Sequence, residues 1–223
     1  MPEVRVLYLA ANPIDTPRMR LDQEIRAISE KVRGATSPRQ VVMIPWFAVR
    51  PDDLLQALNE TTPHVVHFSG HGTQGKLFLE DPSGKAKAVT EQALGQLFET
   101  MHGNIRVVVL NACYAHSLAA ALAQVVDCAI GTDSAITDPQ AIIFAGSFYR
   151  AIAFGRSVYE AYRQGRAALE LEGVSGAQPE LLSHPGVNPA SIVLLEGVAG
   201  ESKKRLFDIG RDPDSIERFY EKE

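Results

Sequence analysis

The segments Val65-Val66-His67-Phe68-Ser69-Gly70-His71-Gly72 and Val107-Val108-Val109-Leu110-Asn111-Ala112-Cys113 decide how this chain folds. Each is a short apolar run of the kind that forms a strand buried on both faces of a sheet. His71 follows the first run and Cys113 follows the second, so a reactive side chain stands at the end of each expected strand. If the strands are parallel neighbours, about 4.8 Å apart, both side chains emerge at the carboxyl edge, where open α/β sheets place their sites. The two segments therefore predict a site that combines a thiol with an imidazole.

The composition describes an ordinary globular chain. It has 223 residues, of which 45% are hydrophobic and 22% charged, and these values suit one large α/β domain. The net charge of −5 argues against a general grip on nucleic acid, and no apolar run approaches the roughly 20 residues of a membrane span. Residues 1–5 lack the apolar core of a signal peptide, and two cysteines are too few for a disulfide framework. We therefore expect a cytoplasmic protein that contacts neither nucleic acid directly nor a membrane.

Strand-like and helix-like segments alternate along the chain. Besides the two opening segments, strands are expected at 4–10, 41–44, 125–131 and 191–195, with a hairpin at 77–89. Helices are expected from Thr16-Pro17, at 51–59, from Thr90 to about 101, at 114–123, from Asp138-Pro139 to 154, and from Ser157 to 171, with a loop at 173–189. This alternation predicts a parallel sheet with helices on both faces. It forms one domain over residues 1–199, followed by a charged tail at 200–223.

Four blocks of sequence occur together in one order. They are Val6-Leu7-Tyr8-Leu9-Ala10-Ala11-Asn12-Pro13, then 67–72, then 110–113, and finally 144–155. With these blocks the chain resembles the caspase-like fold, and within it the bacterial CHAT branch, over roughly residues 4–196. The resemblance implies an α/β fold, a caspase-like three-layer αβα sandwich with a mostly parallel central sheet. The caspase signature Q-A-C-x-G is not met, because Asn111-Ala112-Cys113-Tyr114-Ala115 stands there, so the likeness is to the wider clan.

Cys113 is the candidate nucleophile and His71 its candidate partner. Cys113 lies where a strand is expected to pass into a helix, whose electropositive amino terminus favours a thiolate. Otherwise it would be a buried, inert cysteine. His71 stands between Gly70 and Gly72, which allow backbone and substrate to approach closely; otherwise it would bond turn carbonyls. The resemblance implies that His71 is the general base and acid, and that the backbone N–H groups of Gly72 and Cys113 form the oxyanion hole.

Substrate selection is expected to involve acidic residues. Caspase-like proteases outside the caspases often take a basic residue before the scissile bond, and some have an aspartate two residues before the nucleophile, where this chain has Asn111. Asp133, at a strand's carboxyl end, is the expected substitute. Asp138 is a further candidate, although the proline after it favours the role of helix cap. Glu80 and Asp81 are expected to border the cleft from the hairpin.

The other histidines and the second cysteine have simpler expected roles. His64 and His67 lie in an apolar strand and are expected to be hydrogen-bonded core residues. His116, on the helix expected after Cys113, is a rival base. Cys128 lies in an apolar run and is expected to serve packing. Neither cysteine has metal-ligand spacing, so no metal and no cofactor is expected.

These residues predict a cysteine endopeptidase with a Cys/His dyad. The resemblance implies a regulated protease of bacterial defence or programmed cell death that cleaves a dedicated protein partner. An activating protein partner or sensor is also expected, because the chain carries no recognisable sensor module. Two alternatives stay open: a catalytically silent caspase-like interaction module, and a small-molecule acyl-transfer or hydrolase enzyme that uses the same dyad. An ordinary thiol would favour the first alternative, and a closed pocket the second.

Overall fold

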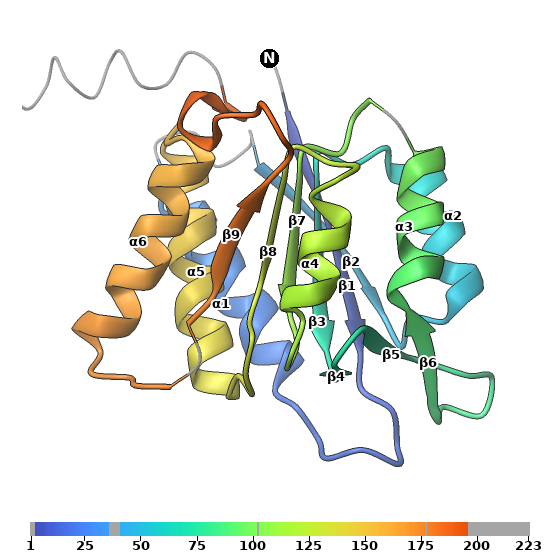
Figure 1. Cartoon of the computed structure of the whole chain (residues 1–223). Coiled ribbons are helices and arrows are strands. Elements are labelled where there is room, and N and C mark those ends of the chain that lie inside the picture. Colours follow the sequence, from blue (N-terminus) through green and yellow to red (C-terminus); the bar gives the residue numbers. More distant parts are fainter. Residues whose placement is uncertain (1–2, 36–40, 102, 177, 196–223) are drawn as a thin grey trace, which may run out of the picture.

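A six-stranded sheet runs through the computed structural model, which describes residues 3–35, 41–101, 103–176 and 178–195 (Figure 1). Its strands, in spatial order, are β2 (Val41–Phe47), β1 (Val4–Ala11), β3 (Val65–Gly70), β7 (Val107–Asn111), β8 (Cys128–Gly131) and β9 (Glu180–Ser183). Neighbouring strands are parallel except β8 and β9, which pair antiparallel. A second, antiparallel sheet contains β4 (Gly72–Thr73), β5 (Lys76–Glu80) and β6 (Ala86–Thr90). The mostly parallel central sheet predicted from the sequence is confirmed.

Helices cover the sheet in two layers (Figure 1). They are α1 (Leu21–Arg33), α2 (Pro51–Thr61), α3 (Glu91–Thr100), α4 (His116–Leu122), α5 (Asp138–Ala153) and α6 (Val158–Leu171). Helices α1, α5 and α6 pack on one face, and α2, α3 and α4 on the other. The three-layer αβα architecture is therefore also confirmed.

Successive side chains of each strand point to opposite faces of the sheet, so each strand contributes residues to both helix layers. On β1, Tyr8 faces the α1, α5 and α6 layer, whereas Leu7 and Leu9 face the α2, α3 and α4 layer. On β7 the same division separates Val109 from Leu110. Because helices cover both faces, the strands need apolar residues on both sides, which explains the continuous apolar runs in the sequence.

Local signals fixed several element ends as predicted. The Thr90 side chain caps α3, and Ser157 forms a capping box with Glu160 at the start of α6. The expected hairpin joins β5 to β6, and Gly84 in its turn has φ = 79°, a conformation that favours glycine.

Helix α1 begins later than predicted. Thr16-Pro17 was expected to open it, but the helix starts at Leu21. The residues before it form a loop in which the Asn12 side chain accepts the Met19 N–H at 3.2 Å and donates to the Met19 carbonyl at 3.3 Å. These tertiary bonds outweigh the local Thr-Pro signal, and they leave the loop lying along the carboxyl edge of the sheet.

Helices α4 and α5 also differ from expectation at their first residues. Helix α4 begins at His116, after a turn, and not directly after Cys113. Helix α5 begins at Asp138, but its cap is Thr137, whose hydroxyl accepts the backbone N–H of Gln140 in a capping box. The predicted role of Asp138 as the helix cap is therefore wrong, because a threonine directly before it already serves the same N–H groups.

The last strand lies elsewhere than predicted. Residues 191–195 were expected to be a strand, but a 3₁₀ turn ends at Ser191 and only a single bridge joins Val193 to Ser157. The Ile192 carbonyl accepts the first N–H of α6, so this segment packs against that helix. The sheet ends instead with β9, which lies inside the expected loop at 173–189. The charged tail at 200–223 lies outside the described residues, so the predicted domain boundary stays a prediction.

Candidate active site

The carboxyl ends of β3 and β7 bring His71 and Cys113 to one place. The two strands are parallel neighbours, and Ser69 lies opposite Asn111 at the end of their ladder. His71 and Cys113 each follow this last pair by two residues. Both residues are half-buried. The carboxyl end of β3 lies at the lower edge of the sheet in Figure 1. The parallel pairing predicted from the two apolar segments is confirmed.

A backbone carbonyl orients the His71 ring. The Nε2 atom of His71 lies 2.7 Å from the carbonyl oxygen of Pro17. A carbonyl only accepts hydrogen bonds, so Nε2 carries the hydrogen and the neutral ring keeps a lone pair on Nδ1. Pro17 belongs to the loop between β1 and α1. The sequence did not reveal this contact, because a helix was expected at these residues.

Cys113 lies in a turn and not at a helix start. Its neighbour Tyr114 has φ = 56°, a left-handed conformation that is uncommon for a residue other than glycine. The Tyr114 N–H donates to the Ser134 carbonyl at 3.1 Å, and the Cys113 thiol lies 3.7 Å from the Ile136 carbonyl. The loop after β8 therefore packs against Cys113 and its neighbour. Since α4 starts only at His116, the expected support of the thiolate by a helix amino terminus is wrong.

Gly72 lies against the backbone of Cys113. A Cβ atom at residue 72 would stand 2.7 Å from the Cys113 carbonyl oxygen and 3.0 Å from the Ala112 Cβ atom. Only glycine allows this approach. The two residues expected to supply oxyanion donors are thus brought together, while their role as donors stays a prediction.

The three predicted substrate-binding residues have different surroundings. Asp133 is exposed on the loop after β8, where a neighbouring serine hydroxyl donates to its carboxylate at 2.9 Å. Asp138 accepts the backbone N–H of Arg20 at 3.0 Å, which ties α5 to the loop before α1. Asn111 is 2% exposed, and its amide donates to the Glu24 carboxylate at 2.5 Å. Of the three, Asp133 presents the most accessible carboxylate.

The two acidic residues of the hairpin are hydrogen-bonded to backbone groups. Glu80 accepts the N–H of Asn12 at 2.9 Å, which links β5 to the end of β1. Asp81 accepts the N–H groups of Ser83 and Lys85 at 2.8 and 3.0 Å within its own turn. Both side chains hold the hairpin in place beside the edge.

His64, His67 and His116 have partners other than Cys113, and Cys128 is buried in the sheet. His67 is fully buried with both ring nitrogens bonded, and His64 accepts a backbone N–H of β1 at 3.0 Å, which confirms that both are hydrogen-bonded. His116 lies 3.5 Å from the carboxylate of Glu180 in β9. Cys128 is buried in β8, and burial raises the pKa of its thiol to about 12. Its predicted packing role is confirmed.

A buried carboxylate beneath the edge was not predicted from the sequence. Glu24 on α1 is 2% exposed, and its two oxygens take bonds from four side chains. These are Tyr8, His67, Ser69 and Asn111, which together with Glu24 form what we call the Glu24 cluster. Burial by itself raises the pKa of Glu24, but the bond and charge of His67, with bonds from Ser69 and Asn111, lower it overall. Helical spacing is the signal that was missed, since Glu24 shares the buried stripe of α1 with Leu21 and Ile28.

The described residues form neither a cluster of metal ligands nor a membrane-spanning helix. No three His, Cys, Asp or Glu side chains in the described ranges gather as metal ligands would. No helix of the described chain is long and apolar enough to cross a membrane.

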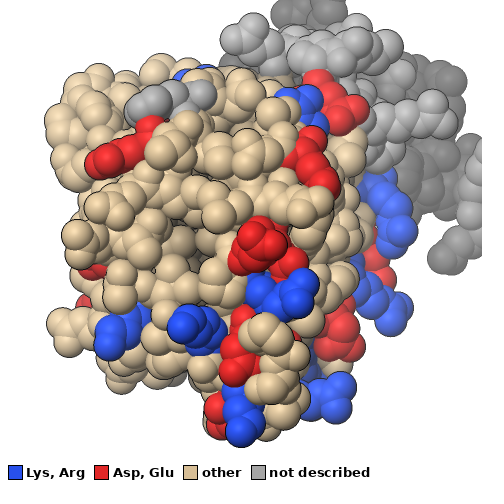
Figure 2. All heavy atoms as spheres, turned by 90° about the vertical axis from the view of Figure 1, so that its right-hand side faces the viewer, with Lys and Arg blue, Asp and Glu red and all other residues tan. Residues whose placement is uncertain are grey.

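On the side that carries α2 and α3, blue and red side chains lie beside one another (Figure 2). On that face charges of opposite sign therefore offset one another locally.

The fold and the paired strand ends define a caspase-like domain, and solved structures agree. The chain is similar to a secreted C11 cysteine protease from Bacteroides thetaiotaomicron in complex with an irreversible peptide inhibitor, with a TM-score of 0.53, 12% identity, and coverage of 74% of this chain and 59% of that chain. It is also similar to the Arg-specific cysteine proteinase gingipain R, with a TM-score of 0.59, 12% identity, and coverage of 85% and 47%. Caspase-1 from Spodoptera frugiperda gives a TM-score of 0.54, 10% identity, and coverage of 81% and 86%. At these identities the likeness concerns the fold.

The chain belongs to the CHAT domain family, whose family model matches residues 10–176. It is 24% identical over 157 residues to a Roc-COR-CHAT protease from an unknown prokaryotic organism. This match covers 66% of this chain and 15% of that protein. It is also 24% identical over 150 residues to a probable protease of Gillisia limnaea, which covers 66% of this chain and 26% of that protein. The matched part is thus about a quarter or less of these relatives' length. The resemblance predicted from four sequence blocks is confirmed.

Proposed function

We propose that this CHAT domain is a cysteine endopeptidase with Cys113 as nucleophile and His71 as general base and acid. The observation that carries the proposal is the register of β3 and β7, which ends on the Ser69–Asn111 pair, two residues before His71 and two before Cys113. The bond from His71 Nε2 to the Pro17 carbonyl supports it, because a base held in one tautomer by a third group is a recurring feature of activated nucleophiles.

The reaction follows from these groups. Nδ1 of His71 takes the thiol proton, and the Cys113 sulfur bonds to the peptide carbonyl carbon, whose oxygen becomes an oxyanion. Backbone N–H groups of Gly72 and Cys113 donate to that oxyanion. The C–N bond then breaks, and His71 returns its proton to the leaving amine. Water, deprotonated by His71, hydrolyses the acyl-enzyme and regenerates the thiol.

Selectivity for a basic side chain before the scissile bond is part of the proposal. Asp133 is exposed, and the next residue, Ser134, bonds to the backbone of Tyr114, directly after Cys113. An acidic group on this loop stands beside the nucleophile's turn and suits an arginine or lysine. Asp138 and Asn111 are weaker candidates, because Asn111 is buried, and Asp138 is less exposed than Asp133 and accepts a backbone N–H from the loop before α1.

The biological setting is proposed from the family. We infer a cytoplasmic, regulated protease of bacterial defence or programmed cell death that cleaves a dedicated protein and responds to an activating protein partner. The lengths of the relatives support a regulated arrangement, since the matched part is 15% of one and 26% of the other.

The test is a search for new peptide termini. Cell lysate is incubated with the wild-type protein and with Cys113→Ala, and termini found only with the wild type are sequenced. We expect cleavage that depends on Cys113, and an enrichment of Arg or Lys before the cut that Asp133→Ala weakens. Iodoacetamide should also label Cys113 well before Cys128 at about pH 7. Equal labelling rates, with no Cys113-dependent termini even after lysate partners are added, would favour the silent interaction module.

A further inference from the structure

Two members of the Glu24 cluster lie on β3 and β7, just before the two residues of the proposed dyad along the chain. Ser69 and Asn111, two of the donors to Glu24, form the last cross-strand pair of β3 and β7. Ser69 stands two residues before His71, and Asn111 two residues before Cys113. Beyond this pair the ladder between the two strands ends. The pair that Glu24 holds is therefore the last one that joins β3 directly to β7 before the two reactive residues.

Both carboxylate oxygens of Glu24 are fully used. Oε1 accepts the Asn111 amide at 2.5 Å and the His67 Nε2–H at 3.0 Å. Oε2 accepts the Ser69 hydroxyl, and the Tyr8 hydroxyl lies 3.2 Å away. One side chain of α1 thus joins the neighbouring strands β1, β3 and β7. The Asn111 amide also donates to a carbonyl of α5 at 3.3 Å, which brings a second helix into the cluster.

Stability alone does not explain a carboxylate here. Glu24 stands on the apolar stripe of α1 with Leu21 and Ile28, where a leucine would also fill space. Burying an ion carries a desolvation penalty, and apolar replacements of buried ionic groups are often neutral or stabilising. What a carboxylate offers and a leucine lacks is short, directional bonds to two strands at once.

We propose that Glu24 is a positioning residue, whose carboxylate holds the Ser69–Asn111 pair so that His71 and Cys113 leave the sheet in one fixed relative geometry. The inference rests on the proposed dyad and adds to it a buried residue that touches no reacting atom. Glu24 acts through its neighbours, so its loss moves the dyad without removing either member. The expected kinetic mark is a fall in kcat of about 10- to 100-fold at unchanged KM, because misplacement of reacting groups slows chemistry more than binding.

Local amide hydrogen exchange tests the inference without a substrate. In Glu24→Ala we expect the amides of residues 70–72 and 112–114 to exchange at least about tenfold faster than in the wild type, while amides in β1 keep their rates. Ser69→Ala removes one bond to β3 and should give a smaller change in the same two segments. Glu24→Gln keeps the shape and part of the bonding, so it should fall between Glu24→Ala and the wild type.

Tyr149→Phe is the matched control. Its hydroxyl lies 3.0 Å from Nδ1 of His67, on the far side of the cluster, and bonds to neither Ser69 nor Asn111 in the described chain. It deletes a buried hydrogen bond of the same kind, so a merely structural effect would appear there too. Should Glu24→Ala fail to fold, Ser69→Ala and Glu24→Gln decide by the same comparison with Tyr149→Phe.

Two outcomes overturn the inference: unchanged exchange at 70–72 and 112–114 in the Glu24 and Ser69 variants, or equal acceleration in Tyr149→Phe. Cys113 alkylation adds a chemical readout, expected to slow about tenfold in Glu24→Ala and to stay at the wild-type rate in Tyr149→Phe. If the wild type proves to have no Cys113-dependent cleavage, the proposed function fails, whereas the exchange experiment still decides whether Glu24 fixes the two strand ends.

Discussion

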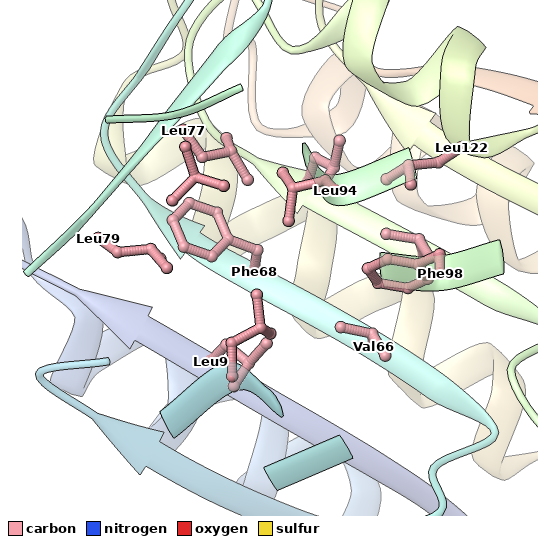
Figure 3. Close-up of a pocket in the computed structure, with 12 residues that line it drawn as sticks. Leu9, Val66, Phe68, Leu77, Leu79, Leu94, Phe98 and Leu122 are labelled. Atoms are coloured by element: carbon pink, nitrogen blue, oxygen red, sulfur yellow. The ribbon is translucent and has the colours of Figure 1, made fainter. Parts of the chain in front are cut away.

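The two faces of the central sheet carry different kinds of side chain along β3 and β7: one face is polar and the other is apolar. On the α1 and α5 side, His67, Ser69 and Asn111 bond to Glu24. On the α2, α3 and α4 side, the alternate residues of β3 and β7 are apolar, and with their neighbours they line a cavity of about 20 Å³ (Figure 3). Its twelve lining residues are all apolar, so the cavity offers a water molecule no polar partner.

This difference separates two tasks that the same strands perform. Apolar side chains supply stability in proportion to the area they bury, but they tolerate small shifts. Hydrogen bonds to a buried carboxylate fix direction and distance, at a cost in desolvation. We therefore expect changes on the apolar face to alter stability first, and changes on the polar face to alter the geometry of the edge first.

The largest effect is expected at the edge itself, which belongs to neither face. Cys113→Ala and His71→Ala should each reduce turnover to background, and the double variant should be no worse, because nucleophile and base act as one unit. Both residues are only half-buried, so the free energy of unfolding should change by no more than about 1 kcal/mol. His116→Ala should keep most activity, since its ring lies beside Glu180. Activity in His71→Ala together with its loss in His116→Ala would assign the base to His116.

Leu110→Ala removes a side chain from the apolar face of the sheet, and Ser69→Ala removes one from the polar face. Leu110 is 3% exposed and lines the cavity, so its truncation should cost about 2–5 kcal/mol of unfolding free energy. Ser69→Ala should cost about 1–3 kcal/mol, because it leaves a buried acceptor short of a donor. Urea unfolding measures the loss of stability in both variants. Iodoacetamide labelling of Cys113 then measures whether the edge of the sheet has changed. We expect Leu110→Ala to keep the labelling rate and Ser69→Ala to lower it; the reverse pattern would contradict the division of tasks.

The polar face should also respond to pH. Because the pKa of Glu24 is lowered in the folded protein, its contribution to stability is present above its unfolded value of about 4.3 and is lost as the pH falls through the lower folded value. The advantage of the wild type over Glu24→Gln in unfolding free energy should therefore shrink between about pH 6 and about pH 3. The other described carboxylates whose pKa values are lowered, Glu30, Asp53 and Asp81, are common to both proteins and cancel in this difference. A constant difference would mean that Glu24 does not titrate as the structure indicates.

The strands, and the places of His71 and Cys113 just after two of them, were predictable because their signals are local. The short, mostly apolar runs before His71 and Cys113 specify buried strands, and parallel pairing then sets the strand ends Ser69 and Asn111 level. The hairpin and the caps at Thr90 and Ser157 depend on residues adjacent in the chain and were also predicted. The short antiparallel strand β9 was missed, because four residues within a glycine- and proline-rich stretch give too little pattern to read.

The parts of the site that were missed depend on long-range contacts. The Pro17 carbonyl reaches His71 because Asn12 bonds to Met19 and folds the loop, and nothing in a Thr-Pro dipeptide shows this. Glu24 was visible in principle, since a charged residue on an apolar helical stripe requires buried partners. Its partners come from three strands, however, and only the assembled sheet brings them together.

The smallest expected effect comes from filling the apolar cavity. Val66, labelled in Figure 3, lines it, whereas its neighbour Val65 points to the opposite face. Val66→Ile adds one methylene next to the void and should raise the free energy of unfolding by up to about 1 kcal/mol. Val65→Ile adds the same group to the face without that void and should instead lower it by about 1–3 kcal/mol through overpacking. Thermal or urea unfolding measures both, and neither variant should change the labelling rate of Cys113. If the two substitutions shift stability in the same direction, the packing of the two faces does not differ as the structure indicates.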